Sequence, residues 1–417
     1  MMIYNDLEDF KKTNLLFFLD KAGLHELNKL KVQFHVKPGR SSKDFKNNVV
    51  DALFLDQIPL TFFIEWLSHI HLEGNNMLFI FESTDHHLFD SNPIDQLYTK
   101  TIPKITPIYE LNTQSINDIS LVNVKRDTNK NQLIFTLAAP SKIIHKDVAT
   151  KELEIIDDIY LCYITMDYDL KHFVLMMHPT DNLYSLNGEE RNDWDDHIWL
   201  FMHKFKNKVI NFKYDDPDWV TGALIDITEE YFHHNNPLIT QKLTEFETSI
   251  LSKAVKQITA NEPTFKRADY MTRISKSISR LYEKELVNLY KVIEKEKPFD
   301  IFLHKAGKDV TEFKANARGN GLSYAQCAEI VRLIGENSVI TTLGIIHKVE
   351  DNGEKKKFPY SVSKTDKFYS LKRTSTATTV KEVVDDVLRK LTSYKQEVQP
   401  TFAGVGEVER RTEFNKS

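Results

Sequence analysis

The chain lacks most of the features by which active sites and membrane segments are recognised. Its 417 residues include only two cysteines, Cys162 and Cys327, without metal-ligand spacing. We therefore expect reduced core thiols rather than a disulfide framework or a zinc site. No uncharged apolar run reaches the roughly 18 residues of a transmembrane helix, and the start lacks the basic and apolar segments of a secretory signal. The expectation is a cytoplasmic protein with no membrane partner.

The signatures of common enzymes are absent as well. No phosphate-binding loop, nucleophile elbow, paired-histidine zinc helix or paired-cysteine motif occurs. The segment Gly319-Asn320-Gly321 lacks the preceding strand and the third glycine of a dinucleotide-binding loop. We therefore assign no catalytic residue and no cofactor, and expect a binding protein rather than an enzyme. A site assembled from distant residues stays open, because it needs no local motif.

Charge is distributed unevenly. Residues 261–417 contain 29 Lys and Arg against 22 Asp and Glu, whereas residues 1–260 contain 26 against 38. A basic half can hold a DNA or RNA backbone by releasing counterions. The acidic N-terminal half would then contact a protein partner or a second copy, and the two halves could equally attract each other. The excess of lysine over arginine, 43 against 12, indicates an AT-rich prokaryotic or phage genome.

The order of the apolar patterns predicts an α+β protein with four parts. We expect an acidic α/β domain with a β-rich middle over 1–236 and an antiparallel helical hairpin over 237–297. A winged-helix-like domain would cover 298–393, and a flexible tail 394–417.

Alternation and helical spacing predict the elements of the first part. Leu30–Val36 alternates and predicts a strand, Pro59–Ile70 has helical spacing, and Met77–Phe81 is a buried strand. An antiparallel meander is predicted from two hairpins, Ile119–Val124 with Gln132–Leu137 and Ile155–Thr165 with His172–Met177.

Three residues of this part are weak candidates for metal ligands. Asp169 begins an Asp-Leu-Lys triplet of the kind in which a carboxylate holds Mg²⁺ in nucleases. Asp193 and His197 belong to another segment, which is rich in carboxylates and imidazoles. The simpler interpretation of residues 193–205 is an acidic helix start followed by a half-buried helix.

The predicted helical hairpin begins at Asn236-Pro237, an N-cap followed by a proline in the first turn. Its second helix, residues 268–296, carries Arg273 and Arg280 on a basic face that could contact phosphate. Apolar helices of this length also suit a scaffold or a homodimer.

The stretch 309–360 predicts a helix-turn-helix followed by a basic wing. Val310, Phe313 and Ala317 indicate a first helix, and residues 323–334 a second. Asn352-Gly353 is a strong hairpin signal, and Lys355, Lys356 and Lys357 follow it. The alternative is a small packing module with solvated lysines.

The leading hypothesis is a non-enzymatic nucleic-acid-associated protein of a prokaryotic, phage-defence-type system. Alternatives are a metal-dependent nuclease or hydrolase using Asp and His of residues 157–203, with Mg²⁺, and an oligomeric scaffold subunit. The leading hypothesis assigns phosphate contact to Arg273, Arg280, Lys314, Arg318, Arg332, Lys348, Lys355, Lys356 and Lys357.

Overall fold

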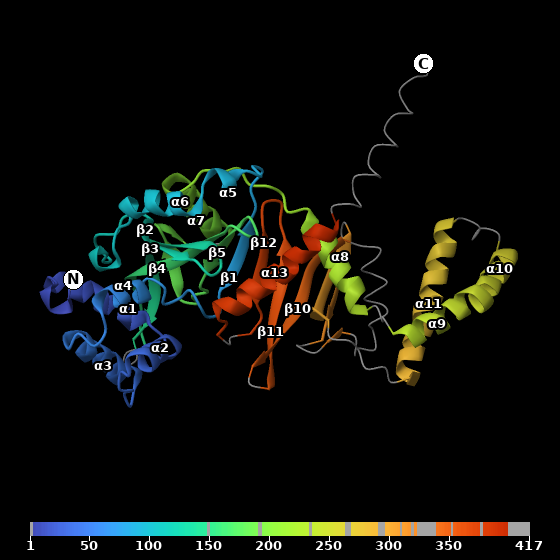
Figure 1. Cartoon of the computed structure of the whole chain (residues 1–417), viewed down its shortest axis with the longest axis horizontal. Coiled ribbons are helices and arrows are strands. Elements are labelled where there is room, and N and C mark those ends of the chain that lie inside the picture. Colours follow the sequence, from blue (N-terminus) through green and yellow to red (C-terminus); the bar gives the residue numbers. More distant parts are fainter. Residues whose placement is uncertain are drawn as a thin grey trace, which may run out of the picture. The chain divides into compact units, whose positions relative to one another are not determined.

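The computed structural model describes residues 3–147, 151–190, 194–232, 236–262, 268–290, 297–308, 311–317, 321–322, 339–351, 353–375 and 378–398. The chain divides into two compact units: unit 1 comprises 1–217 and 365–386, and unit 2 comprises 218–364 and 387–417. Each unit combines helices with antiparallel strands, which confirms the α+β class (Figure 1). Within these ranges, no helix has both the length and the apolar character needed to cross a membrane.

Unit 1 is built on an antiparallel sheet with the strand order β7-β6-β3-β4-β5-β1-β12, and β2 pairs with β3. Its strands are β1 Met77–Phe81, β2 Ser120–Asp127, β3 Gln132–Lys146, β4 Leu153–Asp167, β5 His172–Met177, β6 Leu183–Leu186, β7 Glu189–Glu190 and β12 Tyr369–Arg373. Its helices are α1 Asp9–Lys21, α2 Leu24–Phe34, α3 Ser42–Phe54, α4 Leu60–Leu67, α5 Leu88–Ser91, α6 Ile94–Thr101 and α7 Trp194–Lys208, with short 3₁₀ turns at Tyr4–Asp6, Ile102–Lys104 and Ile108–Glu110. The predicted hairpins are confirmed as β2–β3 and β4–β5.

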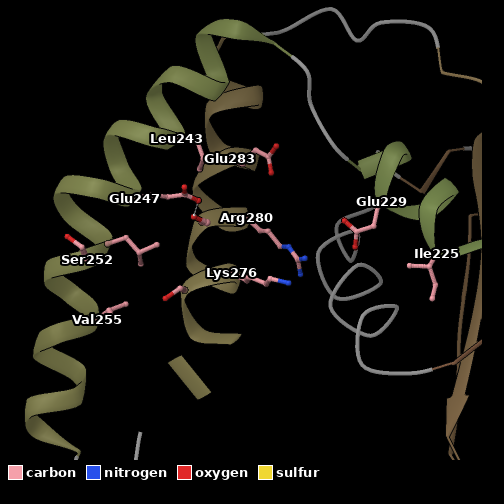
Figure 2. Close-up of a pocket in the computed structure, with 12 residues that line it drawn as sticks. Ile225, Glu229, Leu243, Glu247, Ser252, Val255, Lys276, Arg280 and Glu283 are labelled. Atoms are coloured by element: carbon pink, nitrogen blue, oxygen red, sulfur yellow. Dashed lines mark hydrogen bonds between the residues drawn. The ribbon is translucent and has the colours of Figure 1, made fainter. Parts of the chain in front are cut away.

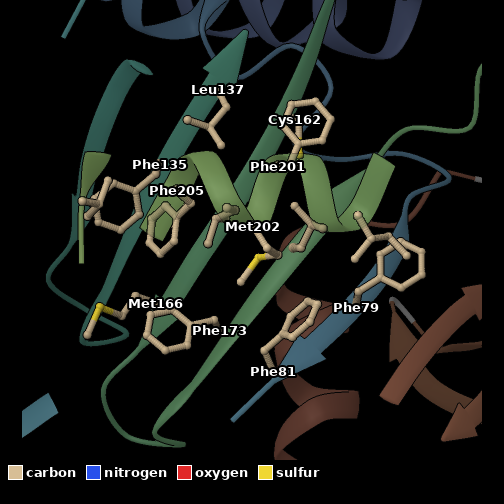
Figure 3. Close-up of a cluster of buried hydrophobic side chains, with 14 of the residues drawn as sticks. Phe79, Phe81, Phe135, Leu137, Cys162, Met166, Phe173, Phe201, Met202 and Phe205 are labelled. Carbon is tan, nitrogen blue, oxygen red and sulfur yellow. The ribbon is translucent and has the colours of Figure 1, made fainter. Parts of the chain in front are cut away.

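The core of unit 1 lies between α7 and one face of this sheet. Phe201, Met202 and Phe205 of α7 pack on apolar side chains of the strands (Figure 3). Phe173 stacks on Phe212 with ring centroids 4.2 Å apart. The apolar residues of α7 recur at helical spacing and therefore lie on one face of the helix. The apolar residues of the strands alternate and lie on one face of the sheet, and the two faces pack together.

The helix α4 lies on the opposite face of the sheet. Thr136 of β3 donates a hydrogen bond to the carbonyl of Ser68 at the end of α4, and the hydroxyl of Tyr163 accepts one from the amide of His71. Thr136 and Tyr163 are partners in the register of β3 and β4, so they point to the same side. Helices therefore cover both faces of the unit 1 sheet.

Unit 2 contains a second run of antiparallel strands in the order β11-β10-β8-β9. These strands are β8 Asp300–Lys308, β9 Thr311–Asn316, β10 Val339–Asp351 and β11 Glu354–Lys364. The helix α8, Trp219–Phe232, packs on β8 and β10. Helix α13, Lys381–Val398, begins in unit 1, and its C-terminal part lies beside α8, where Tyr394 donates a hydrogen bond to Glu230.

The predicted helical hairpin is confirmed in unit 2. Its first arm runs through α9 Pro237–Phe246, a π-helical turn Glu247–Leu251 and α10 Ser252–Asn261, and its second arm is α11 Ala268–Tyr290. The Asn236 side chain accepts hydrogen bonds from the amides of Leu238 and Ile239, as its position before Pro237 predicts. Phe246 stacks on Tyr282 across the two arms at 4.0 Å.

Four predictions from local patterns need correction or fall outside the described residues. Leu30–Val36 is not a strand, because Leu30 belongs to α2 and packs inward with Leu27 while Val32 is 76% exposed. The predicted helix through Phe313 is wrong, because Thr311–Asn316 forms β9 and pairs with β8. Residues 323–338, with the predicted second helix, lie outside the described residues, so the winged-helix unit is not confirmed. The helix α13 continues to Val398, past Tyr394, where the tail was expected to begin.

Candidate functional site

The hairpin formed by β10 and β11 is the part of unit 2 that carries the predicted lysines. Asp351 pairs with Glu354, so the two strands are joined by a connection two residues long that includes Gly353. Gly353 has a φ of 82°, in the left-handed region that a tight hairpin turn requires. The Asn-Gly pair therefore predicted both the position and the length of this turn.

The register of the hairpin separates the three consecutive lysines. Lys357 faces Lys348 of β10, and Lys355 faces Glu350. Because successive residues of a strand point to opposite faces, Lys356 lies on the other side, opposite Val349. The predicted basic cluster is thus divided between the two faces of the sheet.

A second pair of lysines lies on the same face, at the other end of the strands. Lys314 of β9 faces Lys305 of β8, and Lys305 faces Thr342 of β10. Thr342 in turn faces Ser363, and their hydroxyl oxygens are 3.0 Å apart. We call this side of β8–β11 the lysine face and define it by Lys305, Lys314, Lys348, Lys355 and Lys357.

The two ends of the lysine face are well separated. Thr342 and Lys348 lie on the same strand, and a rise of about 3.3 Å per residue places their rows about 20 Å apart. Between them lies a small apolar cluster of Phe302, Leu303 and Ile346. Gly344 is needed beside this cluster, because a Cβ there would lie 2.4 Å from the Cβ of Leu303.

Carboxylates compensate part of this positive charge. Lys348 forms an ion pair of 2.7 Å with Asp300, and Lys305 lies 3.9 Å from Glu312. Lys314 and Lys357 are both exposed and form no ion pair with another described residue. The lysines outnumber the carboxylates on this face, and its free charge lies mainly at these two positions.

The opposite face of these strands is buried. His304, Leu343 and Val362 follow one another across β8, β10 and β11, and all three are inaccessible to solvent. Burial lowers the pKa of His304 from its ordinary value of 6.5 to about 4, so the ring is neutral at physiological pH. The lysine face is therefore opposite a core face, and it is polar at its two ends, while Leu303 and Ile346 between them are buried.

The two arginines predicted for the helical hairpin have a different environment. Both lie on α11; the side chain of Arg273 is outside the described part, and Arg280 lines a cavity of about 830 Å³ bounded by α8 and the hairpin helices. Figure 2 shows Arg280 and Lys276 extending from α11 on the side of Glu229. Glu247 and Glu283 line the same cavity. Its mixed charge does not favour an anion, so the structure adds no support to phosphate contact by Arg280.

The remaining predicted residues are not brought together. Arg318, Arg332 and Asp193 lie outside the described residues. Asp169 is exposed in the turn between β4 and β5 and accepts a hydrogen bond from Asn131, while His197 is buried on α7 in the core of unit 1. Neither belongs to a group of potential metal ligands in the described part of the chain.

Lys305 was missed because its strand was not predicted. Residues 301–303 form a short apolar run that carries no clear period, and Lys305 is placed opposite Lys314 only through the register of β8 and β9. The register that places Lys305 opposite Lys314 leaves no periodic pattern in the sequence, so no local signal could have located it.

Comparison with known proteins adds little. No model of a known protein family matches the chain, and no curated protein matches it. A solved structure described as an "Ntf2 like protein involved in plasmid conjugation" is similar at 12% identity over 62% of this chain and 76% of that chain, with a TM-score of 0.11. A likeness at that level carries no argument about fold or function.

Proposed function

We propose that unit 2 binds the phosphate backbone of nucleic acid through the lysine face, as a non-enzymatic protein of the cytoplasm. The observation that carries the proposal is that two pairs of lysines stand opposite each other in the register of neighbouring strands, Lys305 with Lys314 and Lys348 with Lys357. Directly opposed like charges destabilise an antiparallel sheet. A bound polyanion offsets that repulsion and forms ion pairs with the same lysines.

The spacing of the lysines favours a polymer over a small anion. A single phosphate cannot contact two lysine pairs about 20 Å apart along β10. A backbone that repeats its phosphates can contact both pairs, and the hydroxyls of Thr342, Ser361 and Ser363 on the same face are suitable donors to phosphate oxygens. The lysine face holds no arginine, asparagine or glutamine positioned to distinguish bases, apart from Asn316 at its border on β9. We therefore propose backbone binding with little sequence preference.

Salt-dependent binding tests this proposal. The full chain is titrated into fluorescent duplex DNA, single-stranded DNA and RNA while monovalent salt is raised from about 50 to 200 mM, and the slope of log K against log salt is measured. A triple Lys305→Gln, Lys314→Gln, Lys357→Gln variant should bind more weakly at low salt. On duplex DNA its slope should fall by about 0.9 for each phosphate contact that is lost.

A matched control lies within the same tripeptide. Lys356→Gln removes one charge next to Lys357, but from the opposite side of β11, so it should change affinity less than Lys357→Gln does. If the two single variants lost affinity equally, binding would depend on the overall charge and not on the lysine face. Absence of salt-sensitive binding by the unmodified protein to all three nucleic acids would refute the proposal.

A further inference from the structure

A separate group of polar side chains lies in unit 1, where the first turn of α2 meets the turn that precedes β1. Nε2 of His25 is 3.4 Å from Oε2 of Glu73 and 3.9 Å from Oε1 of Glu26. These three atoms all lie within 4.8 Å of one another, and no other such group of His, Cys, Asp and Glu occurs among the described residues. The three side chains thus converge on one point.

A cation already lies beside this point. Nζ of Lys29 is 2.7 Å from Oε2 of Glu73 and 3.1 Å from Oε1 of Glu26, the same two oxygens that face His25. Glu26 is only 6% exposed, so its carboxylate needs a positive partner close by. The side chain of Lys29 is 40% exposed, and its flexible stem allows the ammonium to leave for solvent without backbone movement.

The ligand chemistry and spacing fit zinc. Imidazole nitrogen and carboxylate oxygen bind Zn²⁺ at about 2.0–2.2 Å, and tetrahedral geometry then places ligand atoms about 3.4 Å apart. The two distances from His25 are close to that value and require little contraction. A fourth position is available to water, as in zinc sites with three protein ligands.

We propose that His25, Glu26 and Glu73 form a Zn²⁺ site, and that Lys29 is a resident cation which the metal displaces. Exchange of one positive charge for two compensates both carboxylates of the group. The metal would also be bound by Nε2 of His25, which makes the imidazole a third ligand.

Calorimetric titration of the full chain with Zn²⁺, after removal of metal by a chelator, tests the site. The expected result is one saturable site per chain, with thermal unfolding shifted to higher temperature by the metal. His25→Ala and Glu73→Gln should each lower the affinity at least about tenfold. Lys29→Met should raise it, because the competing cation is gone.

The exposed pair His87 and Asp90, 3.9 Å apart, provides the control. His87→Ala also removes an imidazole from unit 1, but His87 is not one of the three proposed ligands, so the zinc affinity should stay unchanged. The proposal is overturned if neither the unmodified chain nor Lys29→Met binds zinc saturably, which would make the group an ion-pair network only. It is equally overturned if His25→Ala and Glu73→Gln bind zinc as tightly as the unmodified chain. His25 is exposed, so its variant reports on the site even where Lys29→Met fails to fold.

Discussion

Lysines in unit 1 and lysines on the sheet of unit 2 have opposite surroundings. On the lysine face of unit 2, Lys314 faces Lys305 and Lys357 faces Lys348. In unit 1, three lysines each contact two carboxylates: Lys11 with Glu8 and Glu110, Lys29 with Glu26 and Glu73, and Lys130 with Glu382 and Asp385. The repulsion at Lys314 and Lys357, which form no ion pair with a described residue, opposes folding unless an anion binds, whereas the lysines of unit 1 support the fold.

This difference separates two uses of the same residue. A lysine held between carboxylates fixes neighbouring elements, as Lys130 does between β2–β3 and the start of α13. A lysine such as Lys314 or Lys357, which is opposed by another lysine and forms no ion pair with a described residue, does not link elements in this way, and we propose that it serves binding. Net charge along the sequence suggested the same division, but only the cross-strand partners show which lysines belong to each kind.

The largest expected effect concerns the most buried lysine of unit 1. Nζ of Lys381 is 2.8 Å from both carboxylate oxygens of Asp385 and also donates to the side-chain oxygen of Gln132. Asp385→Ala leaves this ammonium buried with an amide oxygen as its partner. The free energy of unfolding in urea should fall by about 3–5 kcal/mol, the cost typical of breaking a buried ion pair.

Glu382 provides the matched comparison on the same helix. Its side chain is 70% exposed and lies 3.5 Å from Lys130, so Glu382→Ala should change the free energy of unfolding by no more than about 1 kcal/mol. Equal effects of the two substitutions would show that burial does not distinguish these carboxylates, and would weaken the structural role assigned to the lysines of unit 1.

The next effect depends on pH and concerns the buried side of the unit 2 sheet. The pKa of His304 is about 4 in the folded chain and 6.5 in an unfolded one. As pH falls from 6.5 to about 4, the unfolded chain gains a proton that the folded chain does not, so this histidine lowers stability by up to about 1.4 kcal/mol per pH unit. The stability is fully present above pH 6.5.

His304→Leu should therefore flatten the decline of the urea midpoint between pH 6.5 and 4. The exposed His87 is a suitable comparison, because His87→Leu should keep the pH dependence of the unmodified chain. A profile that His304→Leu leaves unchanged would mean that this histidine is protonated inside the fold, contrary to the core character of that face.

Local signals predicted the elements whose shape is decided within a few residues. Asn236-Pro237 gave the start of α9, and Asn352-Gly353 gave the β10–β11 turn, because capping and positive φ are properties of the residues themselves. The strand predicted for Leu30–Val36 was wrong, because the same residues also fit a helix in which Leu27 and Leu30 face the core.

The lysine face and the histidine–carboxylate group could not be predicted in this way. Val310, Phe313 and Ala317 suggested a helix, but pairing with β8 overrides that preference and makes Lys314 a strand residue. Lys305 and Lys314 become neighbours through register, and Glu73 joins His25 through packing of distant segments. Neither relation leaves a period or a spacing in one sequence.

The smallest expected effect tests the comparison most directly. Lys314→Thr replaces one member of an opposed lysine pair by a residue that favours strands. Lys314 forms no ion pair with a described carboxylate, so the substitution breaks none. The free energy of unfolding should rise by about 0.2–1 kcal/mol at low salt, and the gain should shrink as salt screens the repulsion. Lys356→Thr, opposite Val349, relieves no such repulsion and should not show this dependence on salt. If Lys314→Thr destabilises the chain instead, the lysine supports the fold as those of unit 1 do, and the argument for an external anion loses its basis.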